Sequence, residues 1–378
     1  MAHKYLKEEH EIFRESVKKF LDKEVRPFFH EWEKQRSTPK DLWGKFGEQG
    51  FLVPWAEEKY GGFNADFGYS VVLTEEFEKV ASGVGTGLHN DIIVPYIATY
   101  GTEEQKGRWM PKCVSGEYST AIAMTEPGAG SDLGNIQTRA VKKGDHYVIN
   151  GEKTFISNGL KANLVIVACK TDSTAGYKGI SLIVVEEGTP GFKRGKKLEK
   201  IGQHAADTSE LIFEDAIVPV ENLLGQENRG FYYLMEKLQQ ERLMCAIQAI
   251  AAAEESLRIT VEYVKQREAF GKPISKLQNT QFKIAEMATE VAIGRSFIDD
   301  LIVRHMDGED VVTETSMAKW WVTDMAKRLV ANCMQLHGGY GFMEEYAIAR
   351  RYRDIAVTSI YAGTNEIMKQ IIAKKIGL

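Results

Sequence analysis

Residues 233–256, YLMEKLQQERLMCAIQAIAAAEES, place a carboxylate in the middle of an apolar helix face. The segment contains no glycine or proline, and at about 100° per residue Glu241 shares one narrow stripe with apolar residues. The other members of this stripe are Leu234, Leu238, Cys245, Ala249 and Ala252. A carboxylate desolvated in this way has a raised pKa and is a candidate general base. The alternative is that Glu241 forms an ion pair with Arg242 or another buried cation.

The loop AMTEPGAGSDLGN, residues 123–135, concentrates glycines and hydroxyl side chains. Glycine lets a backbone come close to a ligand and present its N–H groups, and Thr125 and Ser131 add hydrogen-bonding hydroxyls. The glycines are one residue too widely spaced for the dinucleotide fingerprint, and no helix is expected to follow them. The alternative is a flexible connection between two domains.

Three further segments begin or end helices with residues that can bind anions. QREAFGKPI (266–274) ends a helix at Arg267, whose guanidinium suits phosphate but is equally an ordinary solvated charge. QLHGGYGF (335–342) stops another helix on glycines, and His337 there is also consistent with a structural role. YAGTNEI (361–367) predicts an N-cap at Thr364 with free N–H groups beside it.

The composition favours a small or medium-sized ligand over nucleic acid. The net charge of the 378 residues is −5, whereas a phosphate-tracking protein normally carries a basic excess. No run of 18 apolar residues predicts a membrane span, and the charged N-terminus lacks the apolar core of a signal peptide. The four cysteines are scattered singly in apolar contexts, which predicts reduced core thiols. We expect a cytoplasmic protein, with an organelle matrix as the alternative.

The periodicities predict three domains of an α+β multidomain protein. These are an N-terminal helical domain (1–120), a middle β-barrel-like domain (121–228) and a C-terminal helical bundle (229–378). Long helical periods cover 231–267, 276–306 and 311–336. In the β region, Asn150-Gly151 predicts a tight hairpin within DHYVINGEKTFIS.

The joint presence and order of MTEPGAGSD, FISNG, QREAFGKPI, QLHGGYGF and YAGTNEI resembles the acyl-CoA dehydrogenase family across nearly the whole chain. The resemblance implies the same three domains, with a four-helix bundle at the C-terminus, and FAD as cofactor. It also implies a homotetramer built as a dimer of dimers, and an electron-transfer flavoprotein as the electron acceptor.

The resemblance further implies site residues. Those expected around the FAD ring system are Ile122, Met124, Thr125, Gly130, Ser131, Phe155, Ile156 and Ser157, with Thr125 and Ser157 as hydrogen-bond partners. Those expected at the FAD pyrophosphate and adenosine, across a subunit boundary, are Arg267, Phe270, Gln278, Gln335, Leu336, His337, Gly338 and Gly339, and the site would be completed by Thr364, Asn365 and Glu366. The CoA thioester is expected to contact Ser131, Gln239, Arg242, Ala362 and Gly363. One departure is Phe155, where many members have tryptophan.

The resemblance also bears on the base. In most members the residue before the glycine of GTNE is a glutamate that removes the thioester α-proton, but here it is Ala362. The branch that includes long-chain and isovaleryl-CoA dehydrogenases places the base before an arginine on the long helix. Glu241-Arg242 matches that branch, which implies that Glu241 takes the α-proton, the flavin takes the β-hydride and the Ala362 N–H binds the thioester oxygen.

A second acid leaves the substrate open. Asp91, in GLHNDIIVPYIATYG, is interpreted first as a helix N-cap or one member of a buried pair. The alternative is a second base at the acyl end of the cavity, which would favour an alicyclic (cyclohexane- or cyclohexene-carboxyl) CoA substrate. Two other functions compete: an acyl-CoA oxidase, which commonly carries an additional C-terminal domain, and a non-catalytic helical scaffold without flavin.

Overall fold

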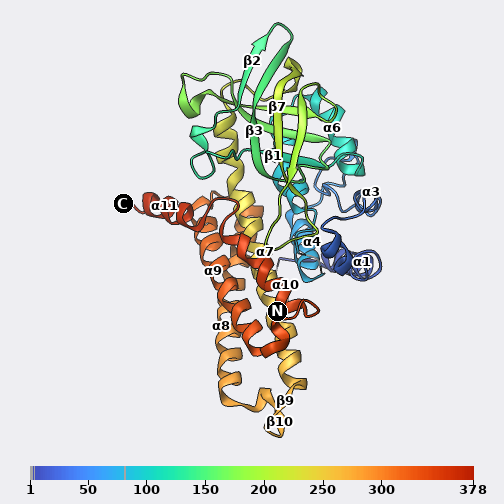
Figure 1. The fold of residues 1–378 in the computed structure, drawn as a ribbon, viewed down its shortest axis with the longest axis vertical. Coiled ribbons are helices and arrows are strands. Elements are labelled where there is room, and N and C mark those ends of the chain that lie inside the picture. Colours follow the sequence, from blue (N-terminus) through green and yellow to red (C-terminus); the bar gives the residue numbers. More distant parts are fainter. Residues whose placement is uncertain (1–2, 4, 81) are drawn as a thin grey trace.

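The computed structural model describes residues 3, 5–80 and 82–378. Figure 1 shows three parts: short N-terminal helices in blue, a sheet domain in green at one end, and long helices that extend away from the sheet. The predicted helical, β and helical parts are therefore present in the predicted order, and the predicted fold class is confirmed. The domain limits at 120 and 228 stay predictions.

The N-terminal part is helical between Glu8 and Ser115. Its elements are α1 (Glu8–Glu24), α2 (Phe29–Gln35), α3 (Leu42–Glu48), α4 (Phe67–Val80), the π-helix η2 (Leu88–Ile93), α5 (Val94–Tyr100) and α6 (Glu103–Ser115). The predicted amphipathic run is broken between α1 and α2 because Pro27 disfavours helical angles in the residue before it.

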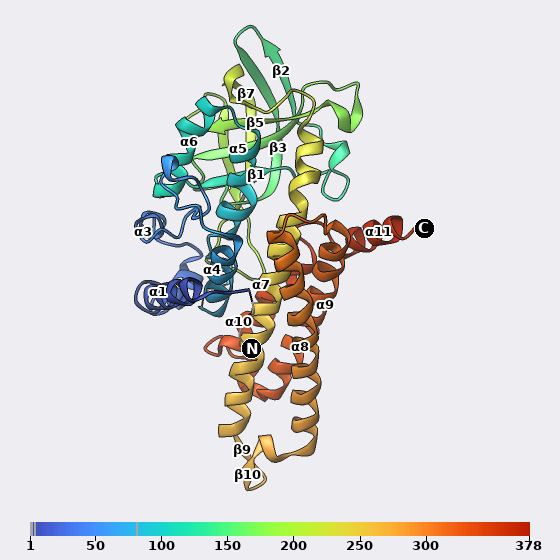
Figure 2. The same ribbon diagram turned by 180° about the vertical axis from the view of Figure 1, so that it is seen from behind.

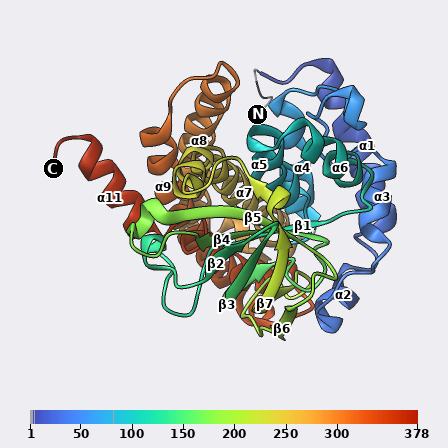
Figure 3. The ribbon, with the colours of Figure 1, turned by 90° about the horizontal axis from the view of Figure 1, so that it is seen from above.

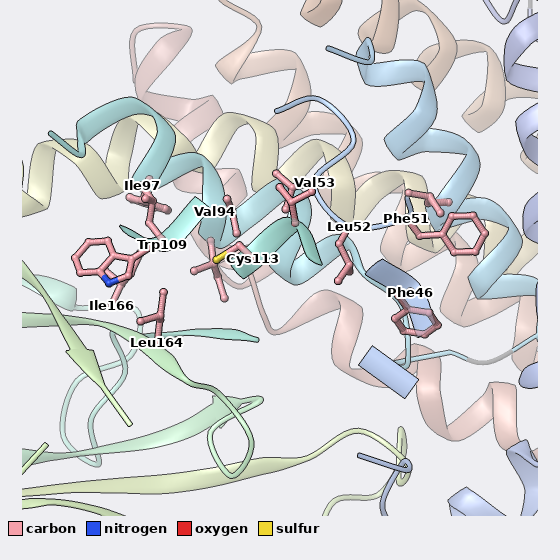
Figure 4. Close-up of a cluster of buried hydrophobic side chains, with 14 of the residues drawn as sticks. Phe46, Phe51, Leu52, Val53, Val94, Ile97, Trp109, Cys113, Leu164 and Ile166 are labelled. Atoms are coloured by element: carbon pink, nitrogen blue, oxygen red, sulfur yellow. The ribbon is translucent and has the colours of Figure 1, made fainter. Parts of the chain in front are cut away.

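The middle part is one sheet with strand order β6-β7-β3-β2-β4-β5-β8, to which β1 is added in parallel with β4. The strands are β1 (Thr120–Ala123), β2 (Arg139–Lys143), β3 (His146–Ser157), β4 (Leu164–Lys170), β5 (Ile180–Glu186), β6 (Phe192–Lys197), β7 (Thr208–Pro219) and β8 (Leu223–Leu224). Strand β4 is buried on both faces, which explains its unbroken apolar sequence. Leu164 and Ile166 pack with Trp109 and Cys113 of α6 (Figure 4). The sheet is thereby fixed to the N-terminal helices.

The predicted hairpin at Asn150-Gly151 is wrong. Strand β3 runs without a turn from His146 to Ser157, and both halves pair with β7. The register shifts between Ile149 and Gly151, so Gly151, with φ of 149°, marks a β-bulge. The true hairpin precedes it at Gly144, between β2 and β3. The Asn-Gly pair predicted a turn because a bulge and a hairpin both favour glycine.

The C-terminal part is built on three long helices, α7 (Gly230–Gln266), α8 (Gln278–Met306) and α9 (Val312–Leu336), close to the predicted limits. A small hairpin, β9 (Glu268–Ala269) and β10 (Lys272–Pro273), joins α7 to α8 at the far end of the bundle. Helix α10 (Ala347–Asp354), the 3-10 helix η8 (Ile355–Ser359) and α11 (Asn365–Lys375) follow. Figures 2 and 3 show α11 projecting from the body of the molecule.

Helix α7 is enclosed by protein over its middle, as its two apolar faces predict. Residues 242–247 are all buried, and α7 packs on both α4 and α9. The four cysteines are buried and unpaired, which confirms the predicted core thiols. Within the described residues, no helix is long and apolar enough to cross a membrane.

Candidate active site

Glu241 lies on α7, and its carboxylate forms no ion pair with the described part of the chain. Its Oε2 atom is shut off from solvent and makes no hydrogen bond with the described residues, although other atoms of the residue keep some exposure. No cation of the described chain lies within the 4.0 Å of an ion pair, so the expected alternative of a pair with Arg242 is wrong. Burial raises the pKa of Glu241 to about 7, while the charges of Arg242 and Lys319 oppose this shift. This carboxyl group is therefore a candidate general base.

Arg242 is a buried cation that forms no ion pair with the residues that the structure describes. It is 6% exposed, and its Nε has no hydrogen-bond partner among the described residues. Its Nη2 lies 3.9 Å from the position that a Cβ of residue 363 would occupy. Buried charges are normally paired, so this guanidinium is suited to a polar ligand beside Gly363.

The turn before α11 presents free backbone donors beside Arg242. Ala362 and Gly363 have φ of 56° and 85°, and Thr364 caps α11 by accepting a hydrogen bond from the Ile367 N–H at 3.3 Å. The predicted N-cap is thus confirmed. In the part of the chain that the structure describes, the N–H groups of residues 362–364 donate to no protein acceptor. Consecutive free N–H groups in such a turn form a concave site for negative charge.

Asp91 lies inside the π-helix η2, and the interpretation as an N-cap or a buried pair is wrong. Gly87 occupies the N-cap position, and no cation of the described chain pairs with Asp91. The Ser70 hydroxyl donates to Asp91 Oδ1 at 2.6 Å, and burial raises the pKa of Asp91 to about 7. The Gln240 amide donates to the Asp91 backbone oxygen at 2.6 Å. The residue before the candidate base therefore fixes the position of η2.

The glycine-rich loop after β1 is held by a buried ion pair that the sequence reasoning missed. Lys153 of β3 is 0% exposed, and its Nζ lies 2.9 Å from Glu126 Oε1 and donates to the Met124 carbonyl at 3.0 Å. Glu126 lies in the motif MTEPGAGSD and Lys153 two residues before FISNG, but the local pattern around each residue does not reveal that they pair. The Cβ positions of Gly128 and Gly130 meet no atom within 4 Å, so the loop offers an open backbone surface.

The predicted FAD-ring residues on strand β3, beside this loop, differ in their exposure. Phe155 and Ser157 are exposed, and Phe155 has φ of 59°. Ile156 between them is 2% exposed in the sheet core, so only its backbone is available to a cofactor. Alternation along a strand explains the difference. Ile122, Met124 and Thr125 are half-buried, whereas Gly130 and Ser131 are exposed.

A cleft of about 550 Å³ lies at the C-terminal end of α7, away from Glu241. Its lining includes the predicted residues Arg267, Gln335, Leu336, His337, Gly338 and Gly339. His337 is stacked on Tyr263 with ring centres 4.2 Å apart and is bonded to the Cys333 carbonyl, which is a structural role. Phe270, 91% exposed at the hairpin tip, and the exposed Gln278 do not line the cleft. Because Arg267 is 26 residues beyond Glu241, the two sites are about 39 Å apart along the helix.

Two predicted contacts are taken up by the protein itself. The Gln239 amide donates to the Glu309 carbonyl and accepts from the Val311 N–H, so its side chain holds the α8–α9 turn. The Asn365 amide donates to Asp324 Oδ1 and Thr323 Oγ1 of α9, so only its backbone is available to a ligand. Glu366 remains exposed at the start of α11.

Comparison with known proteins gives the class of the molecule. Family models described as the N-terminal, middle and C-terminal domains of acyl-CoA dehydrogenase match residues 7–117, 121–216 and 228–377. The long-chain specific acyl-CoA dehydrogenase, mitochondrial, of Sus scrofa is 47% identical over 371 residues, which are 97% of this chain and 86% of that protein. The crystal structure of an acyl-CoA dehydrogenase from Geobacillus kaustophilus has a TM-score of 0.99 and 63% identity, with 100% of both chains covered. A glutaryl-CoA dehydrogenase from Mycobacterium smegmatis in complex with FADH2 has a TM-score of 0.92, 28% identity and coverage of 98% of this chain and 95% of that one.

These matches define a flavin-dependent oxidoreductase fold. The chain belongs to the acyl-CoA dehydrogenase family, which confirms the resemblance, and the alternative of a non-catalytic scaffold is wrong. Its cofactor is FAD, as in the family. The residues present fit this group: the backbone around Gly128 and Gly130 is open, and the cleft at the end of α7 contains Arg267, which forms no ion pair with the described residues and could bind a pyrophosphate.

Proposed function

We propose that this protein dehydrogenates an acyl-CoA thioester to the enoyl-CoA, with Glu241 as the base that takes the α-proton. The observation that carries the proposal is the Glu241 carboxylate, whose Oε2 is buried and unbonded and whose pKa burial raises to about 7. A structural carboxylate in such a place would be expected to have a cation or a hydrogen-bond donor beside it. A carboxylate with neither a cation nor a hydrogen-bond donor beside it is free to accept a proton from a ligand.

Three groups of this chain support removal of the α-proton. Burial weakens the solvation of Glu241, so that it accepts a proton from a weakly acidic carbon more readily than an exposed carboxylate does. The free N–H groups of residues 362–364 donate to the thioester oxygen, where negative charge collects as the proton leaves. The Arg242 guanidinium lies beside the same turn and adds positive charge there. When bound, FAD supplies the acceptor for the hydride that leaves the β-carbon.

The experiment is the change Glu241→Gln, with Glu236→Gln on the exposed side of the same helix as the matched control. Anaerobic mixing with an acyl-CoA should reduce the flavin at least about a hundredfold more slowly in Glu241→Gln, the scale of a general base, with thioester binding retained. Flavin reduction at the wild-type rate would place the base elsewhere. Rapid peroxide formation in air by the wild type would favour the acyl-CoA oxidase alternative.

We infer straight-chain fatty acyl thioesters as the first substrates to test. The support is the 47% identity with a protein named long-chain specific. A series of linear CoA thioesters from short to long, scored by flavin reduction, measures the preferred chain length.

A specific observation favours a second candidate substrate, an alicyclic acyl-CoA. Asp91 Oδ2 accepts no hydrogen bond from the described residues, and it lies 4.0 Å from the Cβ position of Gly87, whose other neighbours include Met244 on α7. A free carboxylate is costly where a fatty tail must lie. In a cyclohexene-carboxyl thioester, conjugation with the thioester makes the γ-proton acidic. Transfer of this proton to Asp91, with loss of a hydride from the other β-carbon to FAD, would give a conjugated diene. Asp91→Asn should then lose activity on the cyclohexene thioester but not on saturated linear or cyclic ones, and equal retention on all three would exclude this candidate.

We propose a homotetramer, arranged as a dimer of dimers, that passes its electrons to an electron-transfer flavoprotein. The cleft around Arg267 lies about 39 Å along α7 from Glu241, which supports its use by the FAD of another subunit. Large apolar side chains in the α7–α8 connection and the first turns of α8 are exposed, including Phe270 (91%) and Phe282 (57%). Sedimentation of the FAD-loaded protein tests the assembly: a monomer that still reduces its flavin would contradict it.

A further inference from the structure

Lys319 of α9 is a buried cation that serves the turn before α11. The residue is 0% exposed, and its Nζ donates to the Gly363 carbonyl at 2.7 Å and to the Asn365 side-chain oxygen at 3.1 Å. Within the described residues, no carboxylate lies within 4.0 Å of it. Burial lowers the pKa of Lys319, because the charged form is desolvated. A well-packed apolar residue would avoid this cost, so stability alone gives little reason for a lysine here.

The carbonyl that Lys319 binds belongs to the segment with the free N–H groups. The C=O and N–H of one trans peptide point in opposite directions, so a Gly363 carbonyl held toward α9 turns the Thr364 N–H away from α9. Ala362 has φ of 56°, in a region that alanine seldom adopts, and Gly363 follows with φ of 85°. A backbone in these angles needs external contacts to persist.

Other contacts hold the ends of this segment but not its centre. The Cys245 thiol contacts the Thr358 carbonyl at 3.5 Å, and the Tyr361 hydroxyl donates to Gln248 Oε1 at 2.8 Å. Lys327, two helical turns after Lys319 on α9, donates to Ser359 Oγ at 3.0 Å. Among the described residues, the Lys319 ammonium alone binds the Gly363 carbonyl.

We propose that Lys319 is a positioning residue, whose ammonium group holds Gly363 and Asn365 so that the N–H groups of residues 362–364 keep the orientation that receives the thioester oxygen. This inference rests on the proposed function, because it requires that a thioester oxygen binds at the turn. It predicts that Lys319 contributes to binding of the ligand's carbonyl group and not to binding of its CoA or hydrocarbon parts.

The test separates these parts with two ligands. In FAD-loaded protein carrying Glu241→Gln, calorimetry compares an acyl-CoA thioester with the S-alkyl-CoA thioether of equal length, which has no carbonyl. Adding Lys319→Met should weaken thioester binding about tenfold and leave thioether binding within about twofold, whereas Lys327→Met, the matched control, should change neither. With Glu241 intact, Lys319→Met should slow flavin reduction about tenfold to a hundredfold, up to the scale of one lost oxyanion donor.

Equal weakening of both ligands, or of neither, would overturn the proposal. If Lys319→Met does not fold with FAD, Lys319→Gln, which keeps an N–H donor on a shorter side chain, is measured in the same way and judged by the same ratio. The Glu241→Gln background also keeps the two proposals distinguishable. Rapid flavin reduction by Glu241→Gln would contradict the assigned base, whereas an unchanged ratio of thioester to thioether affinity would contradict the role of Lys319.

Discussion

Two clusters of buried charge, both in contact with α7, differ in how far the protein satisfies them. In the first, Glu75 of α4 is 2% exposed, and both of its oxygens are bonded: Oε2 to Arg14 at 3.1 Å and Oε1 to Arg295 at 2.8 Å. Arg295 also binds Glu254 of α7 at 2.6 Å. In the second, Glu241 and Arg242 are adjacent in sequence but bind neither each other nor any other described charge.

The difference shows in the pKa values of the two carboxyl groups. Hydrogen bonds and cations hold the pKa of Glu75 well below its usual range despite burial, with His3, Arg295 and Arg14 all contributing. At Glu241, nearby charges offset much less of the effect of burial, and the pKa of that carboxyl rises to about 7. A buried charge that the protein pairs joins elements together, whereas one that it leaves unpaired is available to a ligand.

The largest expected effect comes from breaking the paired cluster. Arg295→Met would leave Glu75 and Glu254 without their main cation, and removal of one partner of a buried pair costs about 3–5 kcal/mol of unfolding free energy. Denaturant unfolding of the FAD-loaded protein measures the loss. A change below about 1 kcal/mol would mean that the cluster contributes little to stability.

Arg242→Met provides the contrast from the unpaired cluster. No protein partner is lost, so the unfolding free energy should stay within about 1 kcal/mol of the wild type or rise. Affinity for the acyl-CoA should fall by about 1.5–3 kcal/mol, the value of a hydrogen bond to a charged group. Calorimetry in the Glu241→Gln background reports this loss, and unchanged affinity would remove Arg242 from the substrate site.

The pH dependence of flavin reduction should follow Glu241. Since the pKa of its carboxyl is about 7 and the base must be ionised, the rate in the free enzyme should rise with pH through about 7 and then level off. The charges that act on it are Arg242 on its own helix and Lys319 on α9. Stopped-flow reduction from pH 5.5 to 9 measures the profile, and a flat profile would contradict the base.

The smallest effect is on stability against pH. The pKa of Glu241 is raised by folding, so between its ordinary value of 4.5 and about 7 the native state binds more protons than the unfolded state. Stability contributed by the protonated form is therefore lost as pH rises through this window. Glu241→Gln should melt higher than the wild type at pH 8 and close to it at pH 4. At Glu75 the sign is reversed, because its lowered pKa contributes stability that is present at neutral pH and is lost as pH falls.

Several features were predictable because they depend on neighbours along the chain. The long helices, the buried strands and the N-cap at Thr364 follow from local periodicity and turn chemistry. The apolar stripe around Glu241 likewise follows from helix geometry, because residues three and four apart must share a face. The loop glycines at 128 and 130 were identified in the same way, from what glycine permits.

Other features depend on which elements meet, and local pattern carries no record of that. Asn150-Gly151 became a bulge because β7 pairs with both halves of β3. Gln239 and Asn365 bind neighbouring helices because of how α8 and α9 pack, and Lys153 pairs with Glu126 because β3 lies beside the loop that follows β1. Local pattern was therefore enough to predict the long helices, the three-part order and a carboxylate on an enclosed helix. It could not predict that Glu241 has no partner among the described residues while Glu75 has several, since pairing of buried charges depends on contacts between residues far apart in the chain.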